Sequence, residues 1–204
     1  MAYLVLDGPD GGGKSTQAEL LTGHLRQLGR TVHHLREPGS TPVGEALRAL
    51  LLDAATGELL PLSEVLLFTA ARAELVARVV APALHRGDDV VAERCYASTL
   101  AYQCVAATPG VDFDWVLDVT RRAHGPWLPD AIYVLDVDVE TAKARRSSRA
   151  ADRFEGRDDA FHQRVRDAYR VVAARDPIVE LVDARGAADA VQQDLRGRVQ
   201  RWLR

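Results

Sequence analysis

Apolar positions along this chain recur at two spacings that alternate from one end to the other. Short runs such as YLVL, at residues 3–6, are apolar at every position, which is typical of a strand buried on both faces. Longer stretches place apolar residues three or four positions apart, as at Leu21, Leu25 and Leu28, and this spacing predicts amphipathic helices. The expected strands cover residues 2–7, 31–37, 88–93, 131–138 and 178–183. The expected helices cover residues 14–28, 43–54, 63–85, 97–107, 112–124, 139–148, 159–174 and 187–203.

The alternation of five strands with helices predicts the arrangement of the chain. Each strand–helix–strand unit favours a right-handed crossover, so we expect an α/β fold with a five-stranded parallel sheet and helices on both faces. No repeat, low-complexity tract or linker divides the sequence, which predicts one domain over residues 1–204. Ligands of such folds bind at the carboxyl ends of the strands. The helix at 63–85 is apolar on every side, which suggests burial or a contact between subunits.

Composition and charge exclude several classes of protein. Hydrophobic residues make up 47% of the chain and charged residues 27%, a balance that argues against disorder and against a fibrous protein. The longest apolar runs are too short to cross a bilayer. The formal net charge of −3 indicates neither a nucleic acid nor a membrane as partner. Residues 1–7 lack a basic head and a small-residue cleavage site, so we expect no signal peptide and a cytoplasmic location.

The most specific motif is GPDGGGKS at residues 8–15, between the first strand and the first helix. It matches G-x-x-x-x-G-K-[ST], in which bare backbone amides surround a polyphosphate at the positive end of a helix. Lys14 supplies a mobile positive charge for the outer phosphates, and the Ser15 hydroxyl is placed to bind magnesium. Asp10 is electrostatically awkward beside phosphates, so it should face a hydroxyl or water on a second substrate. The residues expected to bind ATP are Gly8, Asp10, Gly11, Gly12, Gly13, Lys14, Ser15 and Thr16.

Two pairs of residues could serve a second substrate. Phe68 and Arg72 lie four positions apart, hence on one helix face, which suits an aromatic base and an anionic group. Spacing alone favours core packing for Phe68 and a solvated Arg72. Glu93 and Arg94 end a strand and should point into the ligand crevice, where Arg94 could grip a phosphate and Glu93 could hold magnesium through water. A structural ion pair explains these two residues equally well.

Arginines crowd the segment 145–157. A stretch of this kind is usually only a solvated face. Because this one links two helices in a chain that carries a phosphate loop, we expect it to fold over the transferring phosphate as a lid. Its arginines are Arg145, Arg146, Arg149, Arg153 and Arg157.

Six segments together resemble the thymidylate kinase family of bacterial type, in the family's order and over nearly the whole chain. They are GPDGGGKSTQ, REPGSTPVGEALRALLL, LLFTAARAELV, VVAERCYASTLAYQ, PDAIYVLDVDVETAKAR and DRFEGRDDAFHQRVRDAY. The resemblance implies a P-loop nucleoside monophosphate kinase that transfers a phosphoryl group from ATP to dTMP, gives dTDP for dTTP synthesis, and uses magnesium. It also implies a homodimer formed through the long apolar helices.

The same resemblance assigns roles to residues that would bind dTMP. Asp10 resembles the carboxylate that contacts the 3′-hydroxyl of the nucleotide sugar, a donor that a carboxylate can accept. Phe68 resembles the ring that stacks on thymine, and Arg72 the arginine that reaches the base edge. Arg94 resembles the residue that holds the monophosphate. Tyr102 resembles the residue beside the sugar where a 2′-hydroxyl would otherwise sit. The remaining positions near the base are Ser98 and Thr99.

The resemblance also locates the catalytic arginines. The family places a catalytic arginine either directly after the loop carboxylate or in the lid, and Gly11 at the first place points to the lid. Arg149 and Arg153 are therefore the expected contacts of the transition state. The full expected catalytic set is Lys14, Glu93, Arg94, Arg149 and Arg153.

Three positions depart from the family's usual pattern. Glu93 stands where an aspartate is usual, and its carboxylate is one methylene farther from the backbone. Ser40 replaces a glycine. Ala71 stands where an aspartate commonly precedes the arginine, which would leave Arg72 without that orienting partner.

Three other functions compete with this interpretation. The acceptor could be another nucleoside monophosphate or a nucleoside, although a nucleoside carries no phosphate for Arg94 to hold. A GTPase switch typically reads guanine through Asn-Lys-x-Asp, and this chain contains no asparagine. A catalytically silent nucleotide-binding module is conceivable because of the departures at Glu93 and Ala71.

Overall fold

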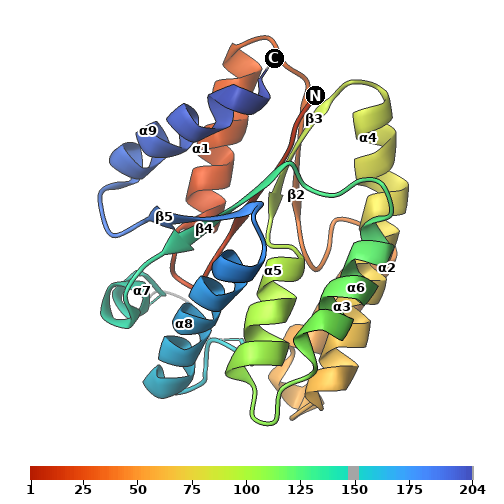
Figure 1. Cartoon of the computed structure of the whole chain (residues 1–204), viewed down its shortest axis with the longest axis vertical. Helices are drawn as coiled ribbons and strands as arrows, with labels where there is room; N and C mark the ends of the chain where they lie inside the picture. Colours follow the sequence, from red (N-terminus) through yellow and green to blue (C-terminus); the bar gives the residue numbers. More distant parts are fainter. Residues whose placement is uncertain (147–151, 204) are drawn as a thin grey trace.

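The computed structural model describes residues 1–146 and 152–203. In that part of the chain the strands are β1 (Tyr3–Asp7), β2 (Val32–Arg36), β3 (Asp89–Glu93), β4 (Ala131–Asp136) and β5 (Val179–Asp183). All five are parallel and form one sheet in the order β2-β3-β1-β4-β5, which confirms the predicted α/β class (Figure 1). Strand β1 is central, and its Leu4 pairs with Val91 of β3 and Ala131 of β4.

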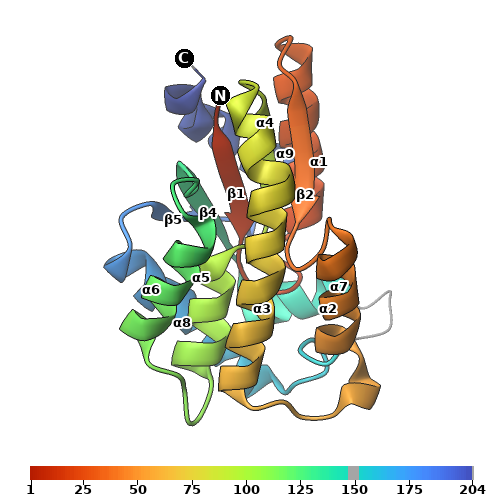
Figure 2. The same ribbon diagram turned by 90° about the vertical axis from the view of Figure 1, so that its right-hand side faces the viewer.

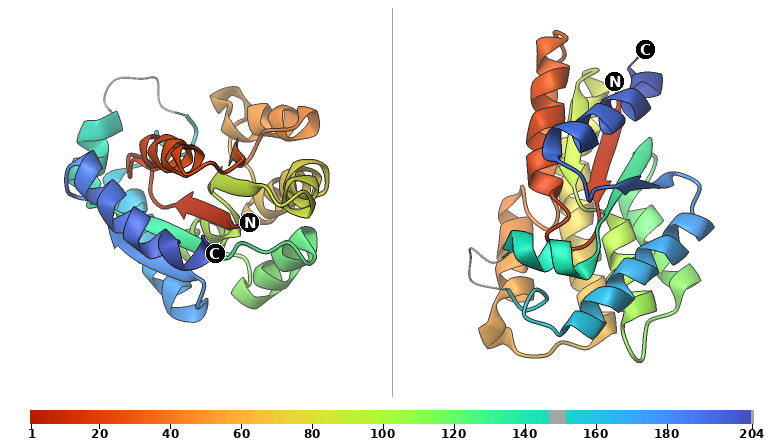
Figure 3. Two further views of the ribbon diagram at one scale, coloured as in Figure 1. Left: turned by 90° about the horizontal axis from the view of Figure 1, so that it is seen from above. Right: turned by 90° about the vertical axis from the view of Figure 1, so that its left-hand side faces the viewer.

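Helices cover both faces of this sheet (Figure 3). Those in the described ranges are α1 (Lys14–Gln27), α2 (Pro42–Leu52), α3 (Pro61–Leu75), α4 (Ala81–His85), α5 (Tyr96–Thr99), α6 (Phe113–His124), α7 (Val139–Arg146), α8 (Asp159–Arg175) and α9 (Ala188–Val199). Short 3₁₀ turns follow α2 at Ala54–Thr56 and α9 at Gln200–Trp202. Among these helices, none is long and apolar enough to span a lipid bilayer.

Alternate side chains of β1 point into two different cores. Leu4 and Leu6 are fully buried against α1 and α9, in a cluster that includes Leu21 and Leu195. Val5 faces the opposite cluster, which α3, α4, α5, α6 and α8 build on the other side. A strand with helices on both sides must be apolar at every position, which is why the run YLVL does not alternate. Burial of each such leucine contributes about 2 kcal/mol.

The helix predicted at 63–85 is interrupted by a wider turn. It comprises α3, a π-helical turn at Val76–Val80, and α4. Pro82 near the start of α4 has no N–H to donate and would clash with the carbonyl four residues earlier. The π turn relieves this conflict without ending the helix. A second π turn, Leu100–Ala106, continues α5 and carries Tyr102.

The carboxyl ends of the strands meet at one edge of the sheet and gather three loops there (Figure 2). The loop at 8–13 follows β1, the loop at 37–41 follows β2, and Arg94 follows β3. Both ends of the chain lie near each other, away from these loops (Figures 1 and 2). Any ligand site built from the strand ends therefore combines residues from three distant parts of the sequence.

Candidate active site

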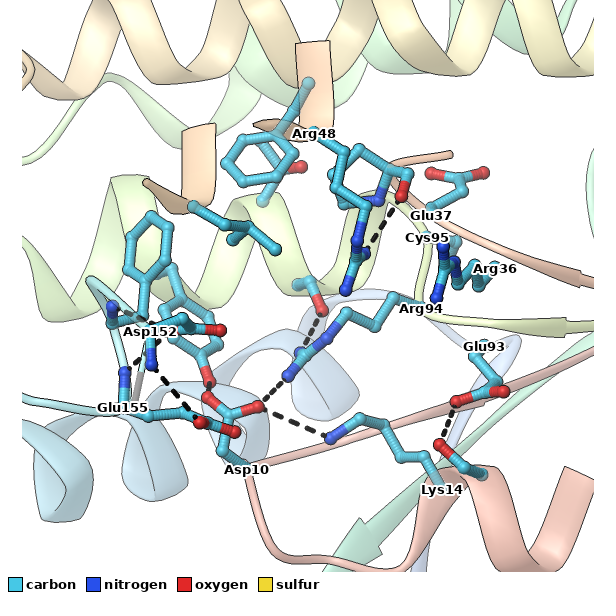
Figure 4. Close-up of a pocket in the computed structure, with 18 of the residues that line it drawn as sticks. Asp10, Lys14, Arg36, Glu37, Arg48, Glu93, Arg94, Cys95, Asp152 and Glu155 are labelled. Atoms are coloured by element: carbon cyan, nitrogen blue, oxygen red, sulfur yellow. Dashed lines mark hydrogen bonds and ion pairs between the residues drawn. The ribbon is translucent and has the colours of Figure 1, made fainter. Parts of the chain in front are cut away.

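One pocket of about 570 Å³ opens at this edge of the sheet. Its volume is within the usual range for sites that bind organic ligands. Most of the residues predicted to bind nucleotides line it: Asp10, Gly11, Gly13, Lys14, Ser15, Thr16, Phe68, Arg72, Glu93, Arg94, Ser98, Thr99 and Tyr102. The fold thus brings the two groups of predicted site residues into one cavity (Figure 4).

The loop between β1 and α1 needs its glycines for backbone geometry. Gly13 caps α1 with a φ of 89°, in the left-handed region. At Gly11, φ is 84° and a Cβ would lie 2.3 Å from the carbonyl oxygen of Ala142 in α7. A side chain at Gly11 would be strained and would also clash with that backbone. The loop therefore runs directly against α7 on its way to the first turn of α1.

Lys14 is folded back over this loop. Its Nζ donates to the carbonyl oxygens of Gly8 at 3.0 Å and Pro9 at 2.8 Å, and lies 3.8 Å from Asp10 Oδ1. Burial and the neighbouring charge of Arg94 lower the pKa of Lys14 to about 8, although Asp10 opposes the shift. The ammonium is thus held by two neutral carbonyl oxygens and an ion pair with Asp10, and a phosphate could displace the carbonyl oxygens.

Asp10 belongs to the phosphate loop, and its carboxylate points into the pocket toward Arg94 and Lys14 (Figure 4). Arg94 Nη2 donates to its Oδ1, and the Tyr102 hydroxyl donates to its Oδ2 at 3.0 Å. Burial would raise the pKa of Asp10, but the charges of Arg94 and Lys14 outweigh it and hold that pKa well below its usual range. Asp10 is therefore a carboxylate at neutral pH, and it links Arg94 to the loop.

Arg94 occupies the centre of the pocket because of an unusual backbone. Its φ is 65°, a region that residues other than glycine rarely adopt. Its Nη1 donates to the Gly8 carbonyl oxygen at 3.3 Å and to Ser98 Oγ at 3.0 Å. Strained backbone of this kind persists where the surroundings determine it, and it is common at functional sites.

Asp7 supplies those surroundings, and sequence reasoning missed it. This fully buried carboxylate ends β1. It accepts the backbone N–H of Cys95 at 3.2 Å and of Ser98 at 3.1 Å, and the Ser98 hydroxyl at 2.6 Å. The Tyr169 hydroxyl, from α8, donates to it at 2.8 Å. The bonds hold the turn that follows Arg94, and nothing local in the sequence distinguishes Asp7 from an ordinary strand end.

Glu93 and Ser15 form a pair of oxygen donors beside the loop. The Ser15 hydroxyl donates to Glu93 Oε2 at 2.5 Å, and His34 Nε2 lies 3.0 Å from the other carboxylate oxygen. Burial would raise the pKa of Glu93, but these hydrogen bonds hold it below its usual value. An ionised carboxylate next to a hydroxyl is a donor set that fits magnesium. His34 of β2, also absent from the predicted site, fixes the orientation of the longer glutamate side chain.

Arg72 is buried with a partner that the sequence did not indicate. Its Nε–H donates to Glu37 Oε2 at 2.8 Å, and its Nη2 donates to Thr99 Oγ1 at 3.2 Å. Ala71 does leave Arg72 without the aspartate usual in the family, but Glu37 takes its place as the orienting partner. The solvated alternative was wrong, because Arg72 is only 2% exposed. Glu37 comes from the loop after β2, which only the folded sheet brings beside α3. Arg72 Nη1 has no hydrogen-bond partner within the described ranges.

The arginines predicted to form a lid have different positions. Arg149 lies outside the described residues. Arg145 and Arg146 both line the pocket; Arg146 contacts His162 at 3.1 Å, and Arg145 donates to the carbonyl oxygen of Ala184 at 3.0 Å. Arg153 is not among the pocket-lining residues of the described chain, and its guanidinium is held by Glu64 of α3 at 2.7 Å. This conformation does not support a contact between Arg153 and the transferring phosphate.

Several other residues that line the pocket were not predicted. They are Arg36, Glu37, Pro38, Arg48, Leu52, Cys95, Gln103, Asp152, Phe154 and Glu155, whereas Arg145 and Arg146 belong to the arginines that were predicted to form a lid. Arg48 Nη1 donates to the Pro38 carbonyl oxygen at 3.0 Å, beside the cis peptide bond between Glu37 and Pro38. Many of these residues lie in two of the motif segments, REPGSTP and DRFEG. Their place in those segments was the sequence signal that could have identified them as pocket residues.

Known proteins resemble this chain over almost its full length. A model of the thymidylate kinase family matches residues 6–195. The thymidylate kinase of Pelotomaculum thermopropionicum is 43% identical over 196 residues, which are 95% of this chain and 90% of that protein. The thymidylate kinase of Thermomicrobium roseum is 46% identical over 178 residues, covering 86% of this chain and 82% of that protein. The crystal structure of thymidylate kinase from Ehrlichia chaffeensis has a TM-score of 0.78 at 27% identity and covers 98% of both chains. With sequence and fold in agreement, this chain belongs to the thymidylate kinase family.

Proposed function

We propose that this protein transfers the γ-phosphoryl group of ATP to the 5′-phosphate of dTMP and so makes dTDP. The observation that carries the proposal is the position of Arg94, whose guanidinium contacts both the Gly8 carbonyl and Asp10 of the phosphate loop. An anion held by Arg94 is adjacent to one held by the loop, as phosphoryl transfer between two nucleotides requires. The family of this chain supports dTMP as the acceptor.

Positioning and charge are the catalytic contributions that these residues can make. Phosphoryl transfer needs no covalent intermediate on the protein, because alignment and electrostatic stabilisation supply most of the catalysis. Lys14 exchanges its loop carbonyls for the outer phosphates, where its charge offsets that of the equatorial oxygens. Arg94 holds the dTMP phosphate so that one of its oxygens attacks in line. Asp10 orients Arg94 and has lone pairs left for the 3′-hydroxyl.

The proposed cofactor is magnesium, which when bound neutralises part of the phosphate charge. The Ser15 hydroxyl and the Glu93 carboxylate are the oxygens that would hold it. His34 engages the second oxygen of Glu93 and leaves Oε2 aimed at Ser15. A longer glutamate is therefore compatible with the role usually taken by an aspartate, because a neighbouring strand fixes its orientation.

The acceptor end of the pocket fits a pyrimidine deoxynucleotide. Phe68 offers a ring for stacking, and Arg72 keeps an unpartnered Nη1 that can donate to a base carbonyl. In this proposal Tyr102, which is held by its bond to Asp10, lies beside the sugar and leaves no room for a 2′-hydroxyl. Thr99 is held by Arg72, and Ser98 by Arg94, so both lie next to groups that would contact the nucleotide.

Arginines around the phosphates complete the proposal. Arg145 and Arg146 are the described lid arginines that line the pocket, and the charge of Arg146 contributes to the low pKa of Asp10. Arg149 remains a predicted contact of the transition state. Replacing Arg146 with methionine should lower kcat more than it raises either KM, as expected for a group that acts mainly in the transition state.

A panel of acceptors tests the function directly. The purified protein is incubated with ATP and, separately, dTMP, dUMP, dCMP, dGMP or thymidine, first with magnesium and then with EDTA. We expect more product from dTMP than from any other acceptor, and we expect that product to disappear when EDTA removes the magnesium. A preference for another monophosphate or for thymidine would reassign the acceptor, and ATP binding without product would indicate a silent module.

Arg94→Ala should raise the KM for dTMP and lower kcat. A change in ATP affinity alone would show that the role of Arg94 is misassigned.

We also infer that two copies of the chain form a homodimer through the helices on one side of the sheet. Five large apolar side chains on and before α2 and α3 remain exposed: Val43, Leu50, Leu60, Leu62 and Leu66. Exposed apolar residues that cluster in this way often mark a protein interface. Replacing Leu66 with glutamate should give a monomer in sedimentation, whereas a monomeric native protein would contradict the inference.

A further inference from the structure

Arg153 makes its contacts on the acceptor side of the pocket. Its Nη1 lies 2.7 Å from Glu64 Oε1, and both side chains are almost buried, with 12% and 9% exposed. Its Nε–H donates to the carbonyl oxygen of Leu51 at 2.9 Å, at the end of α2. Several bonds to fixed groups from two helices tie the arginine to this place.

Glu64 is itself held in position. It lies on α3 and is buried. Its second oxygen, Oε2, accepts the side-chain amide of Gln103 at 2.8 Å, from the π turn that also carries Tyr102. The carboxylate thus connects α3, the π turn and Arg153. A buried ion pair with its remaining oxygen satisfied is costly to break by removing one partner, because the other charge is left unpaired.

Phe154, the next residue, points into the acceptor end of the pocket. It lines the cavity, with its ring centroid 6.3 Å from that of Phe68 and 5.8 Å from that of Tyr102. The Arg153 guanidinium lies 4.6 Å from the same ring. Arg153 therefore fixes the backbone on which Phe154 is mounted, beside the two side chains proposed to contact the base and the sugar.

We propose that the Arg153–Glu64 ion pair is a latch that holds Phe154 over the acceptor nucleotide, so that Arg153 is a positioning residue for dTMP. This inference rests on the proposed function of the pocket. Phe154, Phe68 and Tyr102 then enclose the nucleoside from several directions and exclude water from it. Loss of the latch releases Phe154 and weakens binding of dTMP. Binding of ATP, which the loop after β1 holds, is unaffected.

The latch and a direct catalytic role for Arg153 give different kinetics. Under the latch, Glu64→Gln and Arg153→Met each raise the KM for dTMP about tenfold, and both leave the KM for ATP unchanged. The double variant has a KM for dTMP no higher than that of the more impaired single variant, because both substitutions break the same pair. If Arg153 instead contacted the transferring phosphate, Arg153→Met would lower kcat and Glu64→Gln would not, and this outcome would overturn the latch.

A matched control lies in the same segment. Arg157 and Glu58 form an ion pair at 3.8 Å in which the side chains are 48% and 86% exposed. Glu58→Gln removes one charge, as Glu64→Gln does, but touches only a solvent-screened pair. It should leave both KM values unchanged. An equal rise in the KM for dTMP in both variants would show that the net charge of the region, rather than the latch, controls acceptor binding.

Hydrogen exchange tests the latch without any assay of activity. The amide of Arg153 donates to the Leu52 carbonyl at 3.4 Å, that of Gly156 to Asp152 at 3.0 Å, and that of Arg157 to Phe154 at 3.2 Å. In the nucleotide-free protein, exchange of these amides should accelerate in Glu64→Gln and not in Glu58→Gln. Unchanged exchange would refute the latch even if dTMP is the substrate. Accelerated exchange in a protein that does not phosphorylate dTMP would refute the proposed function alone.

Discussion

Replacing Glu37 with glutamine isolates the contribution of the buried partner of Arg72. The two side chains are 5% and 2% exposed, and their contact is 2.8 Å. Two unit charges about 4 Å apart attract by about 4 kcal/mol at an effective dielectric constant of about 20. Removing one partner of a buried pair usually costs about 3 to 5 kcal/mol, because the remaining charge stays buried.

The expected loss is at the lower end of that range. Glutamine can still accept the Nε–H of Arg72 through its carbonyl oxygen, so the hydrogen bond survives and only the charge is lost. We therefore expect Glu37→Gln to reduce the free energy of unfolding by about 3 kcal/mol. For a chain of this length, that loss lowers Tm by roughly 7 °C.

Thermal unfolding followed by circular dichroism measures the shift, and α3 provides the control. Glu74 pairs with Arg78 through an exposed i,i+4 contact. Glu74→Gln removes the same charge from the helix that carries Arg72, and it should leave Tm nearly unchanged. A Tm for Glu37→Gln within a degree or two of that for Glu74→Gln would refute the reasoning.

The same substitution has a catalytic signature. Without a charged partner, the Arg72 guanidinium no longer has one preferred orientation toward the base. The KM for dTMP should therefore rise in Glu37→Gln while the KM for ATP does not. A fall in the melting temperature with both KM values unchanged would mean that Glu37 stabilises the fold but does not position Arg72 for the acceptor.

Three other perturbations have clear expected results. Because the pKa of Lys14 is about 8, its charge is lost as pH rises through 8, and bound phosphates favour the protonated form. Titration calorimetry should therefore show ATP binding about tenfold more weakly at pH 9 than at pH 7. An ATP affinity that does not change with pH would contradict the role of Lys14. Gly11→Ala forces a Cβ against the Ala142 carbonyl and should lower kcat/KM for ATP at least about 100-fold. Gly29→Ala, at a similar φ but with open space around it, is the control and should leave kcat/KM unchanged. Equal effects of the two substitutions would exclude the clash as the cause. Phe68→Ala removes a stacking ring and should weaken dTMP about 10- to 100-fold without changing ATP affinity, and a matching loss of ATP would show that Phe68 supports the whole pocket instead.

The sequence alone determined the features that depend on neighbouring residues. Alternating spacings predicted the five strands and the helices between them, because period and length are local properties of the chain. The phosphate loop was equally evident, since the glycines, Lys14 and Ser15 act within one turn of backbone. Arg94 could be placed at the pocket because the carboxyl ends of parallel strands meet there.

Only the tertiary structure decided which partner each charged side chain has. Arg72 pairs with a carboxylate 35 residues away, and the Tyr169 hydroxyl reaches Asp7 across 162 positions. Arg153, which the family resemblance placed at the transition state, forms an ion pair with Glu64 in this structure. Such pairings depend on how helices and loops pack in three dimensions, and a buried charge is stable only beside whichever opposite charge or donor that packing supplies.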